Sequence, residues 1–281
     1  MKRTILILVA FSAFACKTAT VPAPAPAPVA AVQCNPGHSI LNATLWLQQS
    51  AEYRAVAMGT YAAATRALDA ALADPSWTAA LEDDAAAQPP AVILDLDETA
   101  IDNSPFQTRV IREGKTFDPK SWEKWTEEGA APAIPGALEF LRYARSRGVT
   151  PFYITNRDAP AEAPGTLANL QRLGYPLVDN GANLMLRGGR PEWKSDKATR
   201  RAHVAANYRV LLLLGDDLND FANAREKSAA EREAIIASNA SRWGTQWFML
   251  PNPMYGSWER ATIGSGGEPC AQLQRKIDAL H

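Results

Sequence analysis

Residues 91–99 read AVILDLDET, and this stretch decides the fold. Its first part, residues 91–96, is short, apolar and rich in β-branched side chains, which is typical of a strand buried in a parallel sheet. Asp95 and Asp97 stand where this strand ends. Because ligands of open α/β sheets bind at the carboxyl ends of the strands, the stretch predicts a buried strand and the position of a site.

Two further apolar runs end in polar residues in the same way. Residues 150–155 (TPFYIT) end at Thr155 and lead into Asn156, and residues 210–214 (VLLLL) lead into Gly215, Asp216 and Asp217. A short run at 183–186 is a candidate for another strand, and helices are predicted at 137–147, 163–173 and 197–207. The alternation predicts an α/β fold, a Rossmann-like parallel sheet with helices on both faces, whose polar strand ends meet in one crevice.

The segments around this core predict a small, mainly helical cap. Residues 39–90 are Ala-rich, and their apolar side chains recur at helical spacing, which indicates one long or broken helix. Residues from about 103 to 135 form an insertion rich in Trp and charge. We expect both segments to contribute to the cap, the core to span 91–262 and residues 263–281 to form a C-terminal tail.

The N-terminus has the pattern of an export signal. Lys2 and Arg3 precede an apolar stretch too short to span a bilayer, so residues 1–15 are interpreted as a signal peptide. The following Cys16 stands in a sequence similar to a bacterial lipobox and is the candidate lipidation site; plain secretion and an uncleaved anchor are the alternatives. Residues 16–38 are a Pro/Ala-rich linker. The expected location is the bacterial cell envelope, lipid-anchored at the outer membrane, or else the periplasm or the medium.

Two cysteines remain in the exported part, Cys34 and Cys270, one at each end of the expected domain. Export exposes thiols to oxidation, so the pair is a candidate disulfide. The sequence leaves open whether they pair, because it does not show proximity.

Composition and motifs exclude several classes of function. The 281 residues carry a formal net charge of −1, so no basic field attracts a nucleic acid polymer. No G-x-x-x-x-G-K-[ST] loop occurs, and none of the three histidines lies in an RHG sequence. The partner we expect is a small molecule bound at the strand ends.

The predicted crevice combines groups suited to phosphoryl transfer. Clustered carboxylates repel one another unless a cation joins them, and hard oxygen ligands favour Mg²⁺. Asp95 is placed to attack phosphorus and form an acyl phosphate. Asp97 would protonate the leaving oxygen and later activate water, while the Thr155 hydroxyl would bind a phosphoryl oxygen. A lysine in the region 194–197 would offset the phosphate charge.

The motifs are similar to those of the haloacid dehalogenase-like superfamily. DLDET (95–99) matches the first motif, Thr155 the second, a lysine near 197 the third, and GDDLND (215–220) the fourth. The chain resembles more closely the class C acid phosphatases of the lipoprotein e type. The shared stretches cover residues 40 to 260 and include WLQQSAEYRA, DLDETAIDNSPF, PGALEFL, FYITNR, SDKATRR and PNPMYGSWE.

The resemblance implies a role for each motif residue. Asp95 is the implied nucleophile and metal ligand, and Asp97 the acid/base, with its backbone carbonyl on the metal. Asp216 is the implied direct ligand of one Mg²⁺ per chain, other divalent ions being the alternative, and Asp220 is the supporting carboxylate. Lys197 is the implied phosphate-binding residue, with Lys194 as its competitor. Asp217 stands where the family pattern has Asn, which adds a negative charge near the metal.

The family also includes enzymes that dephosphorylate nucleoside monophosphates. Asn156, Trp122, Trp125 and Tyr255 are therefore candidate substrate-binding residues, although the aromatic side chains can equally serve to pack the cap. The function predicted from the sequence is a metal-dependent acid phosphatase acting through a phospho-aspartyl intermediate. A ligand-binding envelope lipoprotein and a phosphotransferase are the alternatives, and the oligomeric state, a dimer included, stays open.

Overall fold

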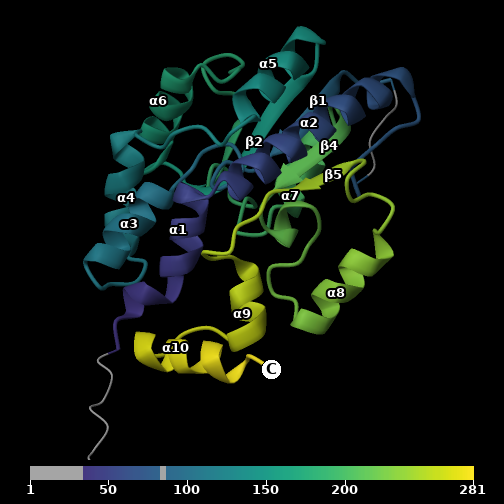
Figure 1. The fold of residues 1–281 in the computed structure, drawn as a ribbon. Helices are drawn as coiled ribbons and strands as arrows, with labels where there is room; N and C mark the ends of the chain where they lie inside the picture. The colour runs from purple at the N-terminus through teal and green to yellow at the C-terminus, as the bar shows by residue number, and fades with distance from the viewer. Residues whose placement is uncertain (1–33, 83–86) are drawn as a thin grey trace, which may run out of the picture. The chain divides into compact units, whose positions relative to one another are not determined.

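A five-stranded parallel sheet forms the centre of the computed structural model, which describes residues 34–82 and 87–281 (Figure 1). The strand order is β3-β2-β1-β4-β5. The strands are β1 (Pro90–Leu94), β2 (Thr150–Asp158), β3 (Leu184–Arg187), β4 (Arg209–Gly215) and β5 (Trp247–Met249). The predicted Rossmann-like α/β fold is confirmed.

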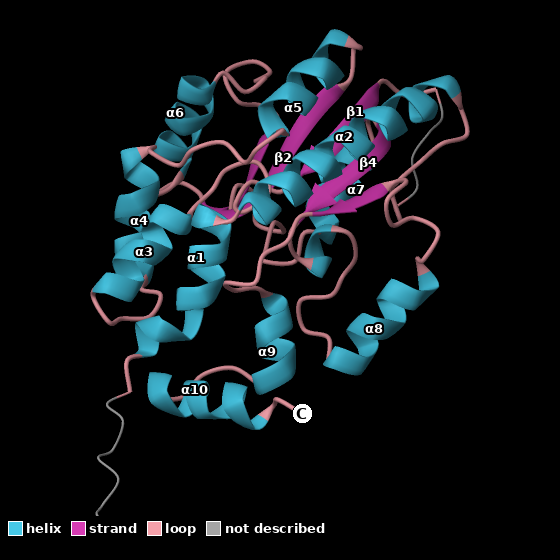
Figure 2. Ribbon diagram, in the orientation of Figure 1, coloured by secondary structure: helices cyan, strands magenta, loops and turns pink. Residues whose placement is uncertain are grey.

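Alternate residues of the strands enter two separate cores. On β1, Val92 and Leu94 belong to the core on one face, and Ala91 and Ile93 to the core on the other. The strand is therefore apolar throughout, as its position inside a parallel sheet requires. Helices cover both faces of the sheet (Figure 2). The first core includes residues of α2 (Ala51–Ala73) and α5 (Ala137–Ser146), and the second includes residues of α7 (Ala198–Ala205).

The apolar runs of the sequence predicted four of the five strands. The candidate at 183–186 is β3, shifted by one residue. The fifth strand, β5, was not predicted, because its three residues are too few to give a periodic signal. Helix α6 spans Ala163–Leu173 as expected and ends at Gly174, whose φ of 72° lies in the left-handed region that glycine adopts readily.

The N-terminal helical segment is broken at Ser50. A 3₁₀ helix, η1 (Pro36–Ile40), leads into α1 (Leu41–Gln49), and α2 begins directly after Ser50. The backbone of Ser50 is extended, and its hydroxyl accepts a hydrogen bond from the Tyr53 N–H at 3.0 Å. A serine that caps the second helix therefore ends the first. Helix α2 packs against α5 and β4, whereas α1 contacts α3.

The insertion after β1 contains two helices, α3 (Ser104–Arg112) and α4 (Pro119–Glu128). Asp118 caps α4 by accepting a hydrogen bond from the Ser121 N–H at 2.8 Å. Helix α4 crosses α6 at Gly165, where an added Cβ would lie 2.1 Å from the Thr126 carbonyl oxygen. Only glycine allows this close approach, which fixes the insertion against the core.

The C-terminal residues are folded. Helix α8 (Ala229–Ser238) lies between β4 and β5, and α9 (Ser257–Ile263) and α10 (Pro269–Asp278) follow β5. The predicted tail at 263–281 therefore contains a helix of ten residues. A disulfide joins Cys34 to Cys270 and attaches α10 to the segment before η1. The candidate pairing of these two cysteines is therefore present in the structure.

The export features lie largely outside the described residues. The predicted signal peptide, Cys16 and the linker up to residue 33 belong to the part of the chain that is not described. Across residues 34–82 and 87–281, no helix combines the length and the apolar character needed to cross a bilayer.

Candidate active site

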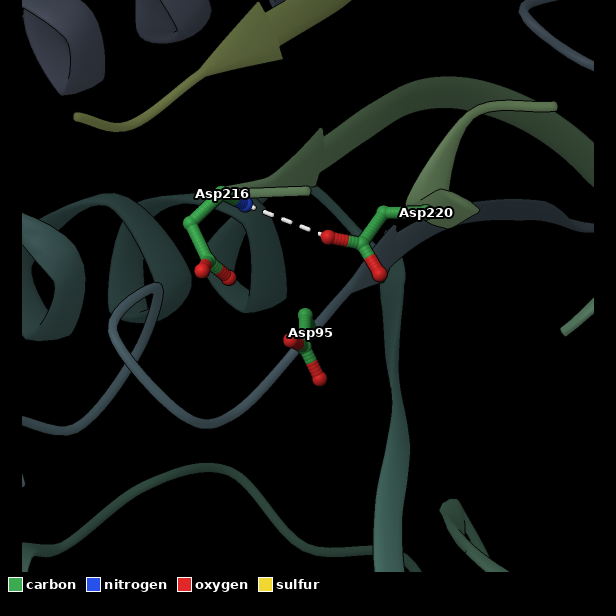
Figure 3. Close-up of side chains that lie close together, drawn as sticks. All are labelled: Asp95, Asp216 and Asp220. Carbon is green, nitrogen blue, oxygen red and sulfur yellow. Dashed lines mark hydrogen bonds between the residues drawn. The ribbon is translucent and has the colours of Figure 1, made fainter. Parts of the chain in front are cut away.

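Three aspartates from separate elements meet at the carboxyl edge of the sheet. Asp95 follows β1, Asp216 follows β4, and Asp220 ends the short 3₁₀ helix η2 (Leu218–Asp220). One carboxylate oxygen from each lies within 4.8 Å of the other two, and the three side chains converge in Figure 3. Asp216 and Asp220 follow Asp95 by 121 and 125 positions in the sequence. Parallel strands that end at one edge of the sheet bring the three residues together, as the sequence predicted.

Lys197 completes this cluster. Its Nζ atom lies 2.7 Å from Asp95 Oδ1 and 2.6 Å from Asp220 Oδ1, and the side chain is 4 % exposed. Burial alone lowers the pKa of Lys197, but the adjacent Asp220 and Asp95 carboxylates raise it above its ordinary value. The ammonium group is therefore charged. Lys194, the competing candidate, is exposed, so the structure favours Lys197 for the site.

Burial favours the protonated form of Asp95 and Asp216 in the absence of a cation. It raises the pKa of Asp95 to about 7, although the Lys197 charge opposes the shift. Burial and the negative charges of Asp95 and Asp220 raise the pKa of Asp216 well above its ordinary value. Three carboxylates with only one lysine among them form a site that a divalent cation would stabilise.

The cluster fits a hard divalent cation. Asp95 Oδ1 is a buried oxygen that lies 2.7 Å from the Lys197 ammonium group and receives no backbone N–H donor from the described residues, so it can also serve as a metal ligand. The other two carboxylates are held in place by their neighbours. Asp220 Oδ2 accepts hydrogen bonds from the N–H groups of Asp216 and Asp217 at 3.1 and 3.0 Å, and Asp216 accepts from Thr99 and Asn252. Fixed carboxylate oxygens of this kind suit Mg²⁺ or a similar ion.

The Asp97 carboxylate does not belong to the three-aspartate cluster, and its predicted roles as acid/base and as a metal ligand through the backbone carbonyl stay predictions. Its Oδ1 atom is 2.8 Å from a terminal nitrogen of Arg157 and accepts a hydrogen bond from Asn103 Nδ2 at 2.8 Å. Its Oδ2 atom accepts a hydrogen bond from the Thr155 hydroxyl at 3.2 Å. The carboxyl group is partly exposed to the cavity described below and is held by three partners.

Arg157 and Asn103 are site residues that the sequence reasoning missed. Arg157 is 2 % exposed and also donates to Thr166 Oγ1 and Asn103 Oδ1, at 3.0 and 3.1 Å. Asn103 in turn is fixed by Glu98, which is fully buried and accepts a hydrogen bond from the Asn103 N–H at 2.8 Å. Both missed residues stand inside stretches already quoted for the resemblance, DLDETAIDNSPF and FYITNR. Their place inside stretches shared with the family was the signal by which the sequence could have identified them.

Thr155 and Asn156 both occupy positions beside the cluster. The Thr155 hydroxyl is fully buried, donates to Asp97 and accepts from the Arg157 N–H at 3.1 Å. Asn156 lines the cavity, but its amide is engaged by Ser195 and Arg200, at 3.0 and 2.6 Å. Its predicted substrate contact therefore competes with hydrogen bonds that hold the loop before α7.

A cavity of about 690 Å³ opens over these groups. Trp122 and Tyr255 line it, in agreement with their selection as candidates. Trp125 does not: it is 2 % exposed, packs against Phe106 and donates its indole N–H to Asn103 Oδ1 at 2.8 Å. The position agrees with the alternative of cap packing, because the ring supports the Arg157–Asn103 network. Phe117, 59 % exposed on the cavity wall, was not predicted.

Asp217, which stands where the family pattern has Asn, is held by the start of α9. Its carboxylate accepts hydrogen bonds from the N–H groups of Asn219 and Ser257 and from the Ser257 hydroxyl. Arg232 lies 3.9 Å from its Oδ1 atom. The negative charge therefore fastens the start of α9 to the η2 loop, and the charge is balanced locally by an arginine.

An open parallel sheet that carries Asp-x-Asp after β1, Thr155 toward the carboxyl end of β2, a buried lysine and two further aspartates after β4 defines a haloacid dehalogenase-like hydrolase. The family is confirmed by comparison: the chain belongs to the HAD superfamily, subfamily IIIB (acid phosphatase), whose family model matches residues 5–258.

Solved and curated relatives agree with this placement. A class C acid phosphatase from Bacillus anthracis superposes with a TM-score of 0.78 at 31% identity, over 88% of this chain and 99% of that one. A structure of the same enzyme with tungstate bound gives a TM-score of 0.76 at 31% identity, with 88% and 98% covered. Acid phosphatase 1 of Solanum lycopersicum is 29% identical over 58% of this chain and 57% of its own length, so the chain spans less than two thirds of that relative. The class C resemblance stated from the motifs is confirmed.

Proposed function

We propose that the protein is a metal-dependent acid phosphatase that hydrolyses small phosphate monoesters through a phospho-aspartyl intermediate on Asp95. The observation that carries the proposal is the position of Asp95. Its carboxylate lies beside the buried Lys197 and within 4.8 Å of Asp216 and Asp220, while Asp97, two residues on, faces the same cavity. Nucleophile, cation and acid/base thus surround one point at the base of a cavity large enough for a small ester.

The residues divide the reaction into two steps. In the first, an Asp95 oxygen forms a bond to phosphorus as the bond to the leaving oxygen breaks, and Asp97 donates a proton to that oxygen, so the alcohol leaves neutral. In the second, Asp97 takes a proton from water, whose oxygen attacks phosphorus and releases Asp95 as a carboxylate and the phosphate as product. Lys197 offsets the negative charge of the phosphoryl group in both steps.

The proposed cation is Mg²⁺, held by Asp95, Asp216 and Asp220. When bound, it supplies positive charge that lets a carboxylate approach a phosphate dianion. The all-oxygen donor set supports a hard ion over one that prefers nitrogen or sulfur ligands.

The proposed substrates include nucleoside monophosphates. Phe117 and Tyr255 offer aromatic surface on the cavity wall, and a base stacked on an aromatic side chain gains about 1–3 kcal/mol in nucleic-acid complexes. Trp122 is a weaker stacking candidate, because its ring already contacts Phe106 and Phe117 and the Arg157 guanidinium lies 5.3 Å from its centre.

We also propose that the chain is exported and lipid-anchored through Cys16 in a bacterial envelope. The Cys34–Cys270 disulfide supports an oxidising compartment, because structural disulfides are rare in the cytosol. Labelling of growing cells with radioactive palmitate tests the anchor. Incorporation that is lost in Cys16→Ser is the expected result, and an unlabelled wild-type protein would contradict it.

Phosphate release tests the function. The wild-type protein is incubated with 5′-nucleoside monophosphates and an aryl phosphate, with Mg²⁺ or with chelator, beside Asp95→Asn. We expect metal-dependent release that Asp95→Asn lowers by about a thousandfold or more, because the nucleophile is lost. Activity that survives Asp95→Asn would refute the intermediate. Binding without turnover across metals and pH would favour a ligand-binding lipoprotein, and phosphate recovered on an added alcohol would indicate a phosphotransferase.

A further inference from the structure

Three arginines from separate parts of the chain meet on one wall of the active-site cavity. Arg187 ends β3, Arg225 lies between η2 and α8, and Arg260 lies on α9, and all three line the cavity that contains Asp95. None of them belongs to the three-aspartate cluster or to the Asp97 network described above. The proposed reaction does not use these three positive charges, although like charges held close together are unfavourable.

The carboxylates near this wall neutralise the group only in part. Arg187 is paired with Asp158, with Nε 2.8 Å from Oδ1. Arg260 donates to Glu226 Oε1 at 2.7 Å. The same Glu226 oxygen is 3.8 Å from Arg225 Nε, which is beyond hydrogen-bond distance. Among the described residues, the ion pairs of the three guanidinium groups involve two carboxylates, Asp158 and Glu226, while Glu162 and Asp217 act on Arg187 and Arg225 from a greater distance. Glu226 is largely exposed, with a side chain 76% accessible to solvent.

Arg225 is the member with unused donors. Within residues 34–82 and 87–281 its guanidinium makes no hydrogen bond, although the side chain is only 36% exposed. The charged groups around it are Arg260, Glu226, Asp217 and Arg187, and Asp217 is already engaged by Ser257 and faces Arg232. Burial, together with the charges of Arg260 and Arg187, lowers the pKa of Arg225. An anion that enters the cavity would relieve this unfavourable gathering of positive charge.

The cavity has room for such an anion in addition to the reacting phosphate. Its volume of about 690 Å³ falls in the range of sites for whole small molecules and greatly exceeds what one phosphoryl group fills. The planar guanidinium group matches the oxygens of phosphate in a paired geometry, which suits arginine to binding phosphate.

We propose that Arg225, with Arg187 and Arg260 beside it, binds a second phosphate group of the substrate, so that the preferred substrates are small phosphate monoesters that carry another phosphate. The inference rests on the proposed function and names a substrate class for the same cavity. The second phosphate is bound and not cleaved, because Asp95, Lys197 and Asp97 act on the phosphate at the carboxyl edge of the sheet and not on the one at the arginines.

The test compares fructose 6-phosphate with fructose 1,6-bisphosphate as substrates of the wild-type protein and of Arg225→Gln. We expect the wild type to favour the bisphosphate in kcat/KM by about tenfold, which is the size of losing a charge-assisted pair of hydrogen bonds. Arg225→Gln should remove this preference by raising KM for the bisphosphate, with kcat and the monophosphate kinetics unchanged. Lys115→Gln is the matched control: Lys115 lines the same cavity but is exposed and paired with Glu113, so the preference should persist.

Two outcomes would overturn the inference while leaving the proposed function intact: equal kcat/KM for both substrates in the wild type, or an equal loss for both in Arg225→Gln. If neither compound is hydrolysed, phosphate release from the nucleoside monophosphates and the aryl phosphate shows whether the proposed function itself fails. Calorimetric titration of the full chain carrying Asp95→Asn with each of the two fructose phosphates then measures binding without turnover. Tighter binding of the bisphosphate that Arg225→Gln abolishes supports the second site, and equal binding of both compounds refutes it.

Discussion

The Lys197 ammonium group lies 2.7 Å from Asp95 Oδ1 and, on its other side, 2.6 Å from Asp220 Oδ1. Lys197 begins α7, whereas the aspartates follow β1 and belong to η2. One side chain therefore ties a helix to two loops at the edge of the sheet. The lysine also supplies the positive charge that keeps two buried carboxylates close together.

Lys197→Met should abolish most of the activity and destabilise the fold. The variant leaves two buried carboxylates without their cation, and breaking a buried pair of this kind costs about 3–5 kcal/mol. We expect a loss of kcat/KM of about a hundredfold or more, and a lower midpoint of urea unfolding. Lys194→Met is the control, because Lys194 is nearby and exposed. Equal effects of the two substitutions would contradict the assignment.

Metal binding should stabilise the protein more strongly as the pH rises from about 4 to about 7. Burial raises the pKa of Asp95 to about 7 and that of Asp216 above its ordinary value. Over this interval the folded metal-free protein holds more protons than the unfolded chain, so its stability falls as the pH rises. A divalent cation replaces those protons and removes the penalty.

Thermal unfolding with Mg²⁺ and with chelator, at several pH values, measures this effect. We expect the difference between the two melting temperatures to be small near pH 4 and to grow toward pH 7. In Asp216→Asn, which removes one carboxylate of the cluster, the difference should shrink at every pH. A difference that is constant across the pH range would argue against coupling between cation and protons at these aspartates.

Sequence reasoning located the residues that stand directly at strand ends. Asp95 and Asp216 directly follow β1 and β4, and Thr155 lies toward the carboxyl end of β2, so the topology of a parallel sheet brings these positions together. Arg157 and Asn103 were missed because their contact joins elements 54 residues apart and depends on side-chain direction. For Trp125 the sequence left substrate contact and cap packing equally open, because composition does not distinguish a ring that faces a cavity from one that packs behind it.

Helices that leave no clear pattern in the sequence were not predicted either. Helices α8 and α10 have no buried residue, so they lack the row of core side chains found in α2 and α5. Helix α8 is instead defined by its start, where Ser228 and Glu231 cap each other, and α10 by the disulfide at its second residue. Burial produces the periodic patterns that a sequence shows, whereas caps and cross-links leave a weaker trace.

Arg157→Lys should lower kcat by about tenfold to a hundredfold. The guanidinium group contacts Asp97 through two nitrogens and also binds Thr166 and Asn103, whereas a lysine supplies one nitrogen and leaves buried acceptors unpaired. The loss should appear mainly in kcat, because Asp97 acts on the leaving oxygen. Steady-state kinetics measure it, with Arg190→Lys as an exposed control. An unchanged kcat, in a variant that unfolds at the wild-type temperature, would show that Arg157 has no role in positioning Asp97.

Removal of the disulfide should lower stability and loosen one wall of the cavity. Cys34 and Cys270 are 236 residues apart in sequence, and cross-links that close long loops restrict the unfolded chain most. We expect Cys34→Ser/Cys270→Ser to lower the free energy of unfolding by about 2–4 kcal/mol. Pro36 and Gly37 of η1 and Gln272 of α10 line the cavity on either side of this bond, so KM should rise severalfold while kcat stays close to wild type. Denaturant unfolding and steady-state kinetics check the two effects, and reduction of the wild-type protein should reproduce both. An unfolding midpoint equal to that of the oxidised wild type would show that the bond contributes nothing to stability.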